Sequence, residues 1–327
     1  MRNLLEYSGS LISNDSLIVA PYDCQKLSYE NILPLNNGLI KNWNIQKFSS
    51  DYSEIEHLNV INGMGVTLGD SIVGISVLSA IKKKNPKIKI KLIRPETAPS
   101  YVEELYELAS SVIDELHYMP FHIQKLPCTA LNIDVGNQLY SPDFHIMEMH
   151  DYFIQGLGVK LDDVNHNELS NKWLGNIDLG APVFENYTLF APIASTKIRS
   201  IPSKFYYDIV DMLSRREGKT VLGFVDVNHK NYINISKYSP HTKDFIALIK
   251  YASNVYTCDS SALHIAAGFG VPTECVFNTI PPELRTKYYS KCKSIYVGNK
   301  RLEKIQSSED FQLVKMVENN YREYLYG

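Results

Sequence analysis

Short apolar runs and longer amphipathic stretches alternate along this chain, a pattern typical of α/β proteins. Apolar runs bounded by Gly, Pro, Asn or Asp predict β-strands at residues 16–20, 58–61, 87–93, 116–119, 131–135, 187–191, 220–225, 254–257 and 273–277. Apolar residues at helical spacing predict helices over residues 71–84, 101–111, 203–215, 242–251, 262–269 and 311–325. Strands that alternate with helices favour parallel sheets covered by helices.

Two of the predicted helices have a clear apolar face. In the helix over 71–84 the face consists of Ile72, Ile75, Leu78 and Ile81. In the last helix, which the run Ser307-Ser-Glu-Asp310 is expected to cap, the stripe consists of Phe311, Val314, Val317, Tyr321 and Leu325. Both faces are expected to pack on a core.

The stretch from Tyr256 to Arg285 has the strand–turn–helix–strand order of a parallel sheet. Its turn contains Asp259, Ser260 and Ser261, which are good N-cap residues for the small-residue helix that follows and that Gly270 closes. The backbone N–H groups at such a helix start can point at an anion. The turn is therefore a candidate anion-binding site.

A second glycine-rich loop follows the strand at 58–61. Gly63, Gly65 and Gly69 have the spacing G-x-G-x-x-x-G, one residue longer than the dinucleotide-binding fingerprint, and Arg94 rather than an acid ends the next strand. An NAD(P) site is therefore the weaker interpretation. Asp70 ends the loop, and its plainest role is that of a helix N-cap.

The composition of the chain is that of a globular protein of about two domains. The 327 residues suggest two domains, and 44% hydrophobic and 21% charged residues are ordinary for a globular protein with a sizeable core. The net charge of −3 gives no general attraction to nucleic acid or membrane. Five cysteines without metal-like spacing suggest reduced thiols. We find neither a signal peptide nor a membrane-length apolar run, and expect a cytoplasmic protein without a transmembrane segment.

Two other groups of residues have ordinary explanations. The basic cluster Lys82–Lys91 fits a solvated helix end and edge strand, and the alternative is peripheral contact with anionic lipid at the inner membrane, or with nucleic acid. His145 and His150 stand five residues apart, which is wrong for the i, i+4 metal pair of a helix. Neither group is a strong site candidate.

The turn and helix at 259–267 carry a family resemblance. They resemble the Asp-Thr-Gly-x-x-His-x-Ala-Ala signature of the bacterial heptosyltransferases, the ADP-heptose:lipopolysaccharide glycosyltransferases. The residues that match are Asp259, His264, Ala266 and Ala267, whereas Ser260 and Ser261 replace Thr and Gly. Gly69-Asp70 also matches the Gly-Asp that ends the first loop of this family.

The resemblance implies a GT-B fold, with two facing Rossmann-like domains and a C-terminal helix that returns to the first domain. On this basis we expect an N-terminal extension over 1–55, an acceptor domain with the catalytic base over 56–165, a linker, a nucleotide-sugar-binding domain over 186–306, and the crossover helix over 307–327. The resemblance does not cover residues 1–55, which are expected to be a decorating hairpin or, alternatively, an acceptor or oligomer surface.

The resemblance also implies a reaction and its residues. The protein would transfer a sugar from a nucleotide-diphosphate sugar to an acceptor hydroxyl, with Asp70 as general base and Gly65 and Gly69 in the acceptor loop. The residues expected to bind the donor are Ser195, Thr196, Lys197, Arg199, Asp259, Ser260, Ser261 and His264. The chain contains no Asp-x-Asp pair of the kind that holds a divalent cation beside a diphosphate, so neither a metal nor another cofactor is expected.

Several alternatives remain open at this stage. The acceptor could be lipopolysaccharide or another glycan, lipid-linked or not, a protein, or a modified base in DNA. The family often has Thr-Pro a few residues after Gly-Asp, and here Gly74 and Ser76 stand near that place. This departure and the one at Ser261 are compatible with a non-catalytic sugar-nucleotide-binding protein, and the glycine loop with an NAD(P)-linked oxidoreductase. The sequence names neither the sugar nor the oligomeric state.

Overall fold

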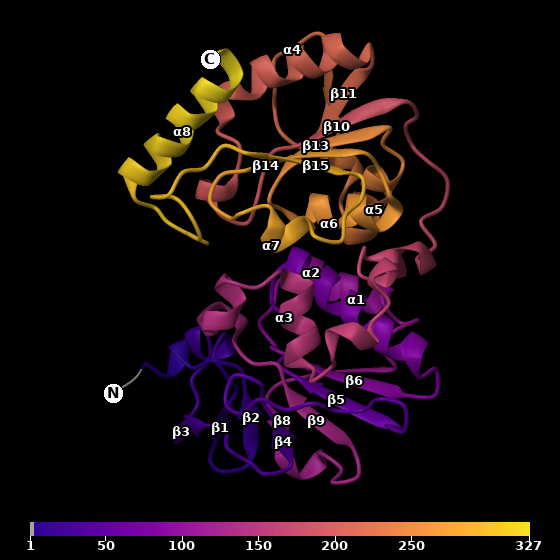
Figure 1. Ribbon diagram of the computed structural model, residues 1–327, viewed down its shortest axis with the longest axis vertical. Helices are drawn as coiled ribbons and strands as arrows, with labels where there is room; N and C mark the ends of the chain where they lie inside the picture. The colour runs from indigo at the N-terminus through magenta and orange to yellow at the C-terminus, as the bar shows by residue number, and fades with distance from the viewer. Residues whose placement is uncertain (1–2) are drawn as a thin grey trace. The chain divides into compact units, whose positions relative to one another are not determined.

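The computed structural model describes residues 3–327 (Figure 1). The chain forms two compact units, the first ending at Leu169 and the second beginning at Ser170. Each unit has its own parallel sheet, and each is described by itself below.

The first unit is built on a parallel sheet with the strand order β4-β9-β5-β6-β7. The bounds of these strands are β4 (Ile40–Lys41), β5 (His57–Ile61), β6 (Lys89–Arg94), β7 (Glu115–Tyr118) and β9 (Leu131–Asp134). Its helices are α1 (Leu68–Lys84), α2 (Ser100–Leu108) and α3 (Met149–Gly156). The predicted face of α1 is buried, and so are Val73 and Val77, because α2 and α3 both pack against this helix.

The N-terminal residues add a small antiparallel sheet to the first unit, with the order β3-β1-β2-β8. Its strands are β1 (Leu11–Ser13), β2 (Leu17–Val19), β3 (Ile32–Pro34) and β8 (Phe121–His122). Ile18 and Leu35 pack with Ile61 and Ile93, which stand at or near the ends of β5 and β6. The buried Asp134 accepts hydrogen bonds from Ser10 N, Ser10 Oγ and Asn42 Nδ2 at 2.7–2.9 Å. Residues 10–42 are therefore tied to the carboxyl end of the parallel sheet.

The second unit contains a parallel sheet with the order β12-β11-β10-β13-β14-β15. Its strands are β10 (Tyr187–Ala191), β11 (Thr220–Gly223), β12 (Tyr232–Asn234), β13 (Asn254–Cys258), β14 (Thr273–Phe277) and β15 (Cys292–Tyr296). Its helices are α4 (Tyr206–Glu217), α5 (Thr242–Lys250), α6 (Ser261–Phe269), α7 (Glu283–Thr286) and α8 (Phe311–Tyr326).

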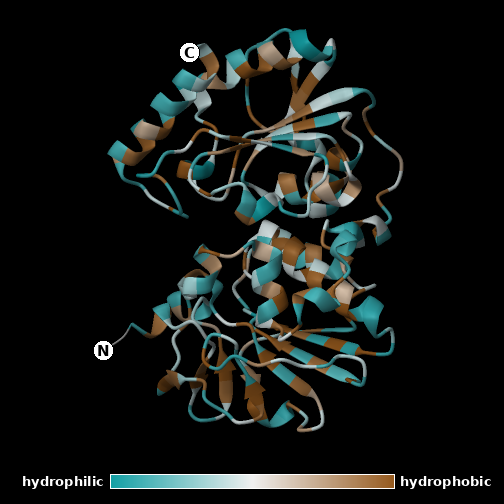
Figure 2. Ribbon diagram, in the orientation of Figure 1, coloured by the Kyte–Doolittle hydropathy of each residue, from teal (hydrophilic) through white to brown (hydrophobic). Residues whose placement is uncertain are grey.

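The residues of β14 show how this sheet separates two layers of helices. Val276 packs in the core cluster that includes residues of α4 and α8. Cys275 and Phe277, which point to the other face, pack with Leu263 of α6. Figure 1 shows α4 and α8 on one side of the sheet and α5, α6 and α7 on the other, and Figure 2 shows apolar residues concentrated on the strands between them.

The C-terminal helix differs from the prediction. Asp310 caps α8 as expected, accepting from the N–H groups of Gln312 and Leu313. The helix belongs to the second unit, and Val317 and Tyr321 are buried in that unit's own core, where Tyr321 stacks on Phe205 with ring centroids 5.8 Å apart. The predicted apolar stripe is shifted. Its first residue, Phe311, is 76% exposed, and the packed face is Leu313, Met316, Val317, Tyr321 and Leu325.

In both sheets the strand order reverses at one strand, β10 in the second unit and β5 in the first. In the second unit β11 and β13 flank β10 on opposite sides, and in the first unit β6 and β9 flank β5. Loops that leave such a point at the carboxyl ends of the strands diverge and leave room for a ligand. These two points are where each unit's candidate site residues lie.

Candidate functional site

A cavity of about 310 Å³ lies at the carboxyl ends of β10, β11 and β13 in the second unit. Ala191 ends β10, Phe224 directly follows β11, and Ser260 comes two residues after β13. The cavity is thus at the reversal of strand order, the usual ligand position in an open parallel sheet. Its volume is at the lower end of the range for small-molecule sites.

The wall of this cavity has an apolar part and a polar part. Phe224 and Phe245 are tilted against each other with centroids 5.1 Å apart, and Pro192 and Ile193 also line the cavity. The polar side chains in the lining are hydroxyls, those of Ser236, Ser239, Ser260 and Ser261. A ligand with a flat apolar group next to a polar group would fit this cavity, with the flat group against the phenylalanines and the polar group against the serines.

The start of α6 opens at the polar part. Ser260 is the N-cap residue, as predicted, but its side chain makes no capping hydrogen bond in the described structure and lies 3.2 Å from Thr257 Oγ1. The N–H groups of the first turn carry the positive end of the helix dipole. They suit an anion better than a neutral group.

An ion pair joins the two loops beside this helix start. Arg199 Nη1 lies 3.1 Å from Asp259 Oδ2, and Arg285 Nε lies 3.7 Å from Asp259 Oδ1. Burial alone would raise the pKa of Asp259, but Arg199, Arg285 and His264 together lower this pKa below its ordinary value. Asp259 is therefore a carboxylate between two guanidinium groups, and this cluster has a net positive charge.

The loop after β10 is organised around Arg199. Its Nε donates to Thr196 Oγ1 at 3.1 Å, its Nη2 donates to Ser195 Oγ, and Thr196 Oγ1 donates to the carbonyl of Gln306 at 3.0 Å. Lys197 is exposed at the start of a 3-10 turn, Lys197–Arg199. The structure thus brings Ser195, Thr196, Arg199 and Asp259 into one network, while Lys197 stays in solvent.

His264 has surroundings different from those of the other predicted donor residues. It is buried, its Nδ1 lies 2.6 Å from Tyr289 Oη, and its backbone carbonyl accepts from Asn171 Nδ2 at 3.0 Å. Asn171 also donates to Tyr289 Oη at 2.8 Å. His264 does not line the cavity that the described residues form at Ser260, so its direct role here is to fix α6 to the neighbouring segments.

In the first unit the glycine loop leads into α1, which begins at Leu68 and not at Ser71. Thr67 is the N-cap residue, so the N-cap role considered for Asp70 is wrong. Asp70 stands three residues into the helix, half-buried, and its Oδ2 accepts a hydrogen bond from Thr67 Oγ1 at 2.8 Å. Gly69 is the second residue of the helix, and Gly65 has a φ of +84° that favours glycine.

Arg94 holds this loop in place. It is fully buried at the end of β6, and its Nη1 donates to the carbonyl oxygens of Gly63 at 2.9 Å and Gly65 at 3.2 Å. Glu103 pairs with the same guanidinium group at 2.9 Å, and the ring of Tyr106 lies 3.6 Å from it. From the sequence, Arg94 counted only against an NAD(P) site, and no local pattern indicated that it would bind the loop.

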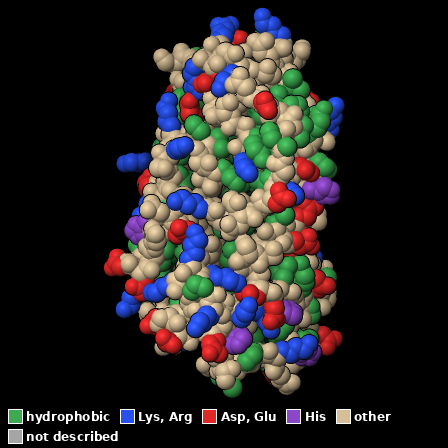
Figure 3. All heavy atoms as spheres, turned by 90° about the vertical axis from the view of Figure 1, so that its right-hand side faces the viewer, with side chains coloured by type: hydrophobic (Ala, Val, Ile, Leu, Met, Phe, Trp, Pro, Cys, Tyr) green, Lys and Arg blue, Asp and Glu red, His purple; other side chains and the backbone are tan. Residues whose placement is uncertain are grey.

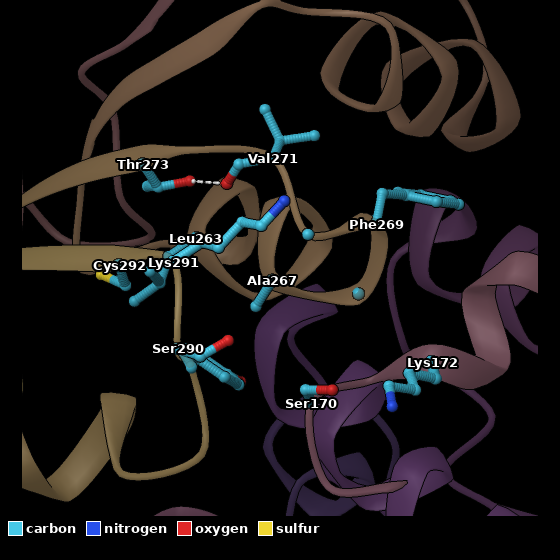
Figure 4. A pocket seen from close by; sticks show the side chains of 13 residues that line it. Ser170, Lys172, Leu263, Ala267, Phe269, Val271, Thr273, Ser290, Lys291 and Cys292 are labelled. Carbon is cyan, nitrogen blue, oxygen red and sulfur yellow. Dashed lines mark hydrogen bonds between the residues drawn. The ribbon is translucent and has the colours of Figure 1, made fainter. Parts of the chain in front are cut away.

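A second cavity lies in the same unit as the predicted donor-binding residues (Figure 4). This cavity of about 240 Å³ lies between the end of α6 and the beginnings of β14 and β15, with Lys172, Ser290 and Lys291 in its lining. It is at the amino ends of the strands, and the C-terminus of α6 carries the negative end of the helix dipole. Its two lysines could attract an anion, but the helix end that borders the cavity disfavours one.

The lysine cluster of the first unit is largely neutralised. Ion pairs within 3.3 Å join five of its lysines to acidic side chains, namely Lys82 and Lys89 to Asp114, Lys83 to Glu168, Lys84 to Asp163 and Lys91 to Glu115. Figure 3 shows basic and acidic side chains interspersed on the face it presents. This arrangement favours a solvated mixed-charge surface over a lipid-binding one.

Residues 3–327 contain neither a candidate metal site nor a helix that could span a membrane. No group of three or more His, Cys, Asp or Glu side chains in this range is arranged to hold a metal ion. Over the same range, each helix is too short or too polar to serve as a bilayer span. All five cysteines are free thiols.

Comparison with known proteins identifies the fold. No protein-family profile and no curated protein sequence matches the chain. Among solved structures, E. coli ADP-heptose LPS heptosyltransferase II shares 12% identity over 83% of this chain and 98% of its own, with a TM-score of 0.50. A family 9 glycosyltransferase from Veillonella parvula shares 15% over 84% and 98%, with a TM-score of 0.52.

The dodecameric iron-containing heptosyltransferase TibC of enterotoxigenic E. coli, solved in complex with ADP-D-β-D-heptose, shares 14% identity over 85% of this chain and 78% of its own, with a TM-score of 0.51. These identities are low, so what the similarity shows is the architecture. The predicted α/β fold is thereby confirmed: the chain has the GT-B fold of heptosyltransferases and family 9 glycosyltransferases.

Proposed function

We propose that this protein is a glycosyltransferase that moves a sugar from a nucleotide-diphosphate sugar to an acceptor hydroxyl. The observation that carries the proposal is the cavity at the ends of β10, β11 and β13, whose lining joins an apolar wall to the start of α6. Asp259 of the Arg199–Asp259–Arg285 cluster directly precedes Ser260, the N-cap residue of that helix. A nucleoside matches the apolar wall, and a diphosphate matches the helix start and the positive cluster. The solved structures with this fold include enzymes whose names specify ADP-heptose as donor.

In the proposed reaction the acceptor oxygen attacks the anomeric carbon of the donor sugar. The bond between that carbon and the diphosphate oxygen breaks, the nucleoside diphosphate leaves with the electron pair, and the configuration at the carbon is inverted. The acceptor proton passes to Asp70, which has a half-buried carboxylate in the first unit. The first unit thus supplies the general base, and the second unit binds the donor.

Negative charge on the departing diphosphate must be stabilised. The N–H groups at Ser260 and Ser261, together with Lys197 and Arg199, are the groups that we assign to this task. They supply positive charge from the protein itself, so the proposed reaction requires no divalent cation.

For the acceptor we propose a glycan, either lipopolysaccharide or a related lipid-linked sugar, reached from the cytoplasmic side of the inner membrane. A modified DNA base or a protein hydroxyl is the alternative acceptor. A non-catalytic sugar-nucleotide-binding protein and an NAD(P)-linked oxidoreductase are the competing functions. Each of these functions predicts that the protein binds a different set of ligands.

A binding screen tests the proposal. Thermal shift and calorimetry with ADP-, UDP- and GDP-sugars and with NAD(P) should show binding of one nucleotide-sugar class, followed by release of the nucleoside diphosphate on incubation. Ser236→Trp should abolish binding by filling the cavity, whereas Ser290→Trp, a matched change at the other cavity, should not. Binding of NAD(P) instead would contradict the proposal, and binding without any turnover would favour the non-catalytic alternative.

A further inference from the structure

Gln138, which lies near Asp70, is buried although its side-chain oxygen has no hydrogen-bond partner among residues 3–327. Gln138 begins the 3-10 turn Gln138–Tyr140, four residues after β9. Asp70 follows β5, and β5 and β9 are neighbours in the sheet at the reversal of strand order. The two side chains thus come from the two loops that border the ligand position of the first unit.

Gly65 is the contact point between these side chains. Both Gln138 Nε2 and Asp70 Oδ2 lie within 3.2 Å of the position that a Cβ atom on Gly65 would occupy. Any larger residue at 65 would collide with both groups, and it would also have to adopt the φ of +84°. Because Gly65 has no side chain, the amide of Gln138 and the carboxylate of Asp70 can both lie next to its backbone.

The side-chain oxygen of Gln138 is not used by the fold. The residue is 5% exposed, and among residues 3–327 no group donates a hydrogen bond to its buried Oε1. Leaving a buried polar atom without a partner is costly, which makes an apolar residue the better choice for stability alone. The adjacent Asn137 is different, because its Nδ2 donates to the carbonyl of Leu5 at 3.0 Å.

We propose that Gln138 binds the acceptor next to the hydroxyl that Asp70 deprotonates. This inference rests on the proposed function. A carboxylate only accepts hydrogen bonds, whereas an amide both donates and accepts. The facing pair can therefore hold two neighbouring hydroxyls of one acceptor, one on Asp70 and one on Gln138. Gln138 is a binding residue that fixes the orientation of the attacking oxygen, and it takes no proton itself.

The experiment compares Gln138→Met with Asn137→Leu. Methionine keeps the length of the glutamine but removes its polar atoms, so the melting temperature of the ligand-free protein should stay equal or rise. Asn137→Leu, which removes a satisfied hydrogen bond, should lower it. A fall for Gln138→Met as large as that for Asn137→Leu would show a structural role and overturn the proposal.

Transfer is then measured to the methyl glycosides of glucose, galactose and mannose, used as soluble acceptors. Gln138→Met should raise the acceptor KM by about tenfold, the value of one hydrogen bond, while the donor Kd measured by calorimetry stays unchanged. An unchanged acceptor KM, or a wild type that turns over donor but uses none of these glycosides, would contradict the proposal. Failure of the proposed function has a different signature, since the wild type would then bind no nucleotide sugar.

Gly65→Ala provides an independent check, with Gly218→Ala as its control. Both glycines have positive φ, at +84° and +62°, but a Cβ on Gly218 would meet nothing within 4 Å. Backbone strain is thus common to both variants, and only Gly65→Ala displaces Gln138 and Asp70. Gly65→Ala should reduce transfer by at least tenfold more than Gly218→Ala, and equal activities would overturn the proposed pairing.

Discussion

Arg199 and Asp259, sixty positions apart in the sequence, form a charged hydrogen bond of 3.1 Å between Nη1 and Oδ2. One residue comes from the loop after β10 and the other from the turn after β13, directly before the N-cap residue Ser260 of α6. Arg285 approaches the other carboxylate oxygen at 3.7 Å. Asp259 thus holds the guanidinium groups of Arg199 and Arg285 beside the start of α6. Its single negative charge does not neutralise both of them, so the cluster stays positive.

Replacing Arg199 by alanine is expected to affect both stability and donor binding. It leaves Asp259 buried without its closest cationic partner, and breaking a buried pair costs about 3 kcal/mol. It also removes a charged donor from the diphosphate site. Chemical denaturation should show the loss of stability, and calorimetry should show donor affinity at least tenfold lower. Arg215→Ala, which removes an exposed helix ion pair, should change the free energy of unfolding by less than about 0.5 kcal/mol.

The same cluster predicts a dependence of stability on pH. The folded-state pKa of Asp259 is below its ordinary value of 3.8, so its ionised form contributes stability above that value, and this contribution is lost as the pH falls through the folded pKa. The free energy of unfolding should therefore decrease below about pH 4 in the wild type. In Asp259→Asn it should be lower at pH 7 and change less on acidification. Parallel curves for the two proteins would contradict the assignment.

The sequence predicted the strands that carry a distinct apolar run, but it did not predict short or polar strands such as β1, β12 and β15. The apolar runs Tyr187–Ala191 and Thr273–Phe277 are strands at the same bounds in the structure, and Gly270 ends α6 as expected. The sequence could identify candidate site residues where they belong to one short motif, as Asp259 and Ser260 do. Arg94 and Arg285 were missed because their partners are distant in sequence, and no spacing rule links Arg94 to Gly63 or Arg285 to Asp259.

Lys197 should contribute to donor binding but not to folding. It is exposed, and no ion pair holds it among the described residues, so Lys197→Ala should leave the melting temperature unchanged. Loss of one charge-assisted bond of roughly 1.5–3 kcal/mol should weaken donor affinity about tenfold or more. Lys291→Ala, an exposed lysine at the other cavity, is the matched control. Equal donor affinities in the two variants would remove Lys197 from the site.

The proposed stabilisation of the diphosphate by protein groups predicts turnover without added divalent metal. Transfer measured in excess EDTA should match transfer in magnesium or manganese to within about twofold, because helix N–H groups and cationic side chains supply the charge. Activity that disappears in EDTA and returns with either metal would overturn this prediction. The donor Kd, measured under the same conditions, separates an effect on binding from an effect on the chemical step.

Asp70 is expected to be the general base, and Asp70→Asn tests this most directly. Asparagine keeps a side-chain oxygen that can accept the hydrogen bond from Thr67, so the start of α1 and the melting temperature should change little. An amide cannot take the proton of the attacking hydroxyl. Transfer should therefore fall by about 10²–10⁴-fold while donor affinity, which belongs to the second unit, remains nearly intact.

Thr67→Val separates the two roles of this carboxylate. It removes the hydroxyl that donates to Asp70 but leaves the carboxylate itself, so it should lower the melting temperature more than Asp70→Asn does and reduce transfer much less. If accepting the hydrogen bond from Thr67 were the only function of Asp70, the order of the two variants in activity would follow their order in stability. An Asn variant that transfers sugar at close to the wild-type rate would place the base on another residue.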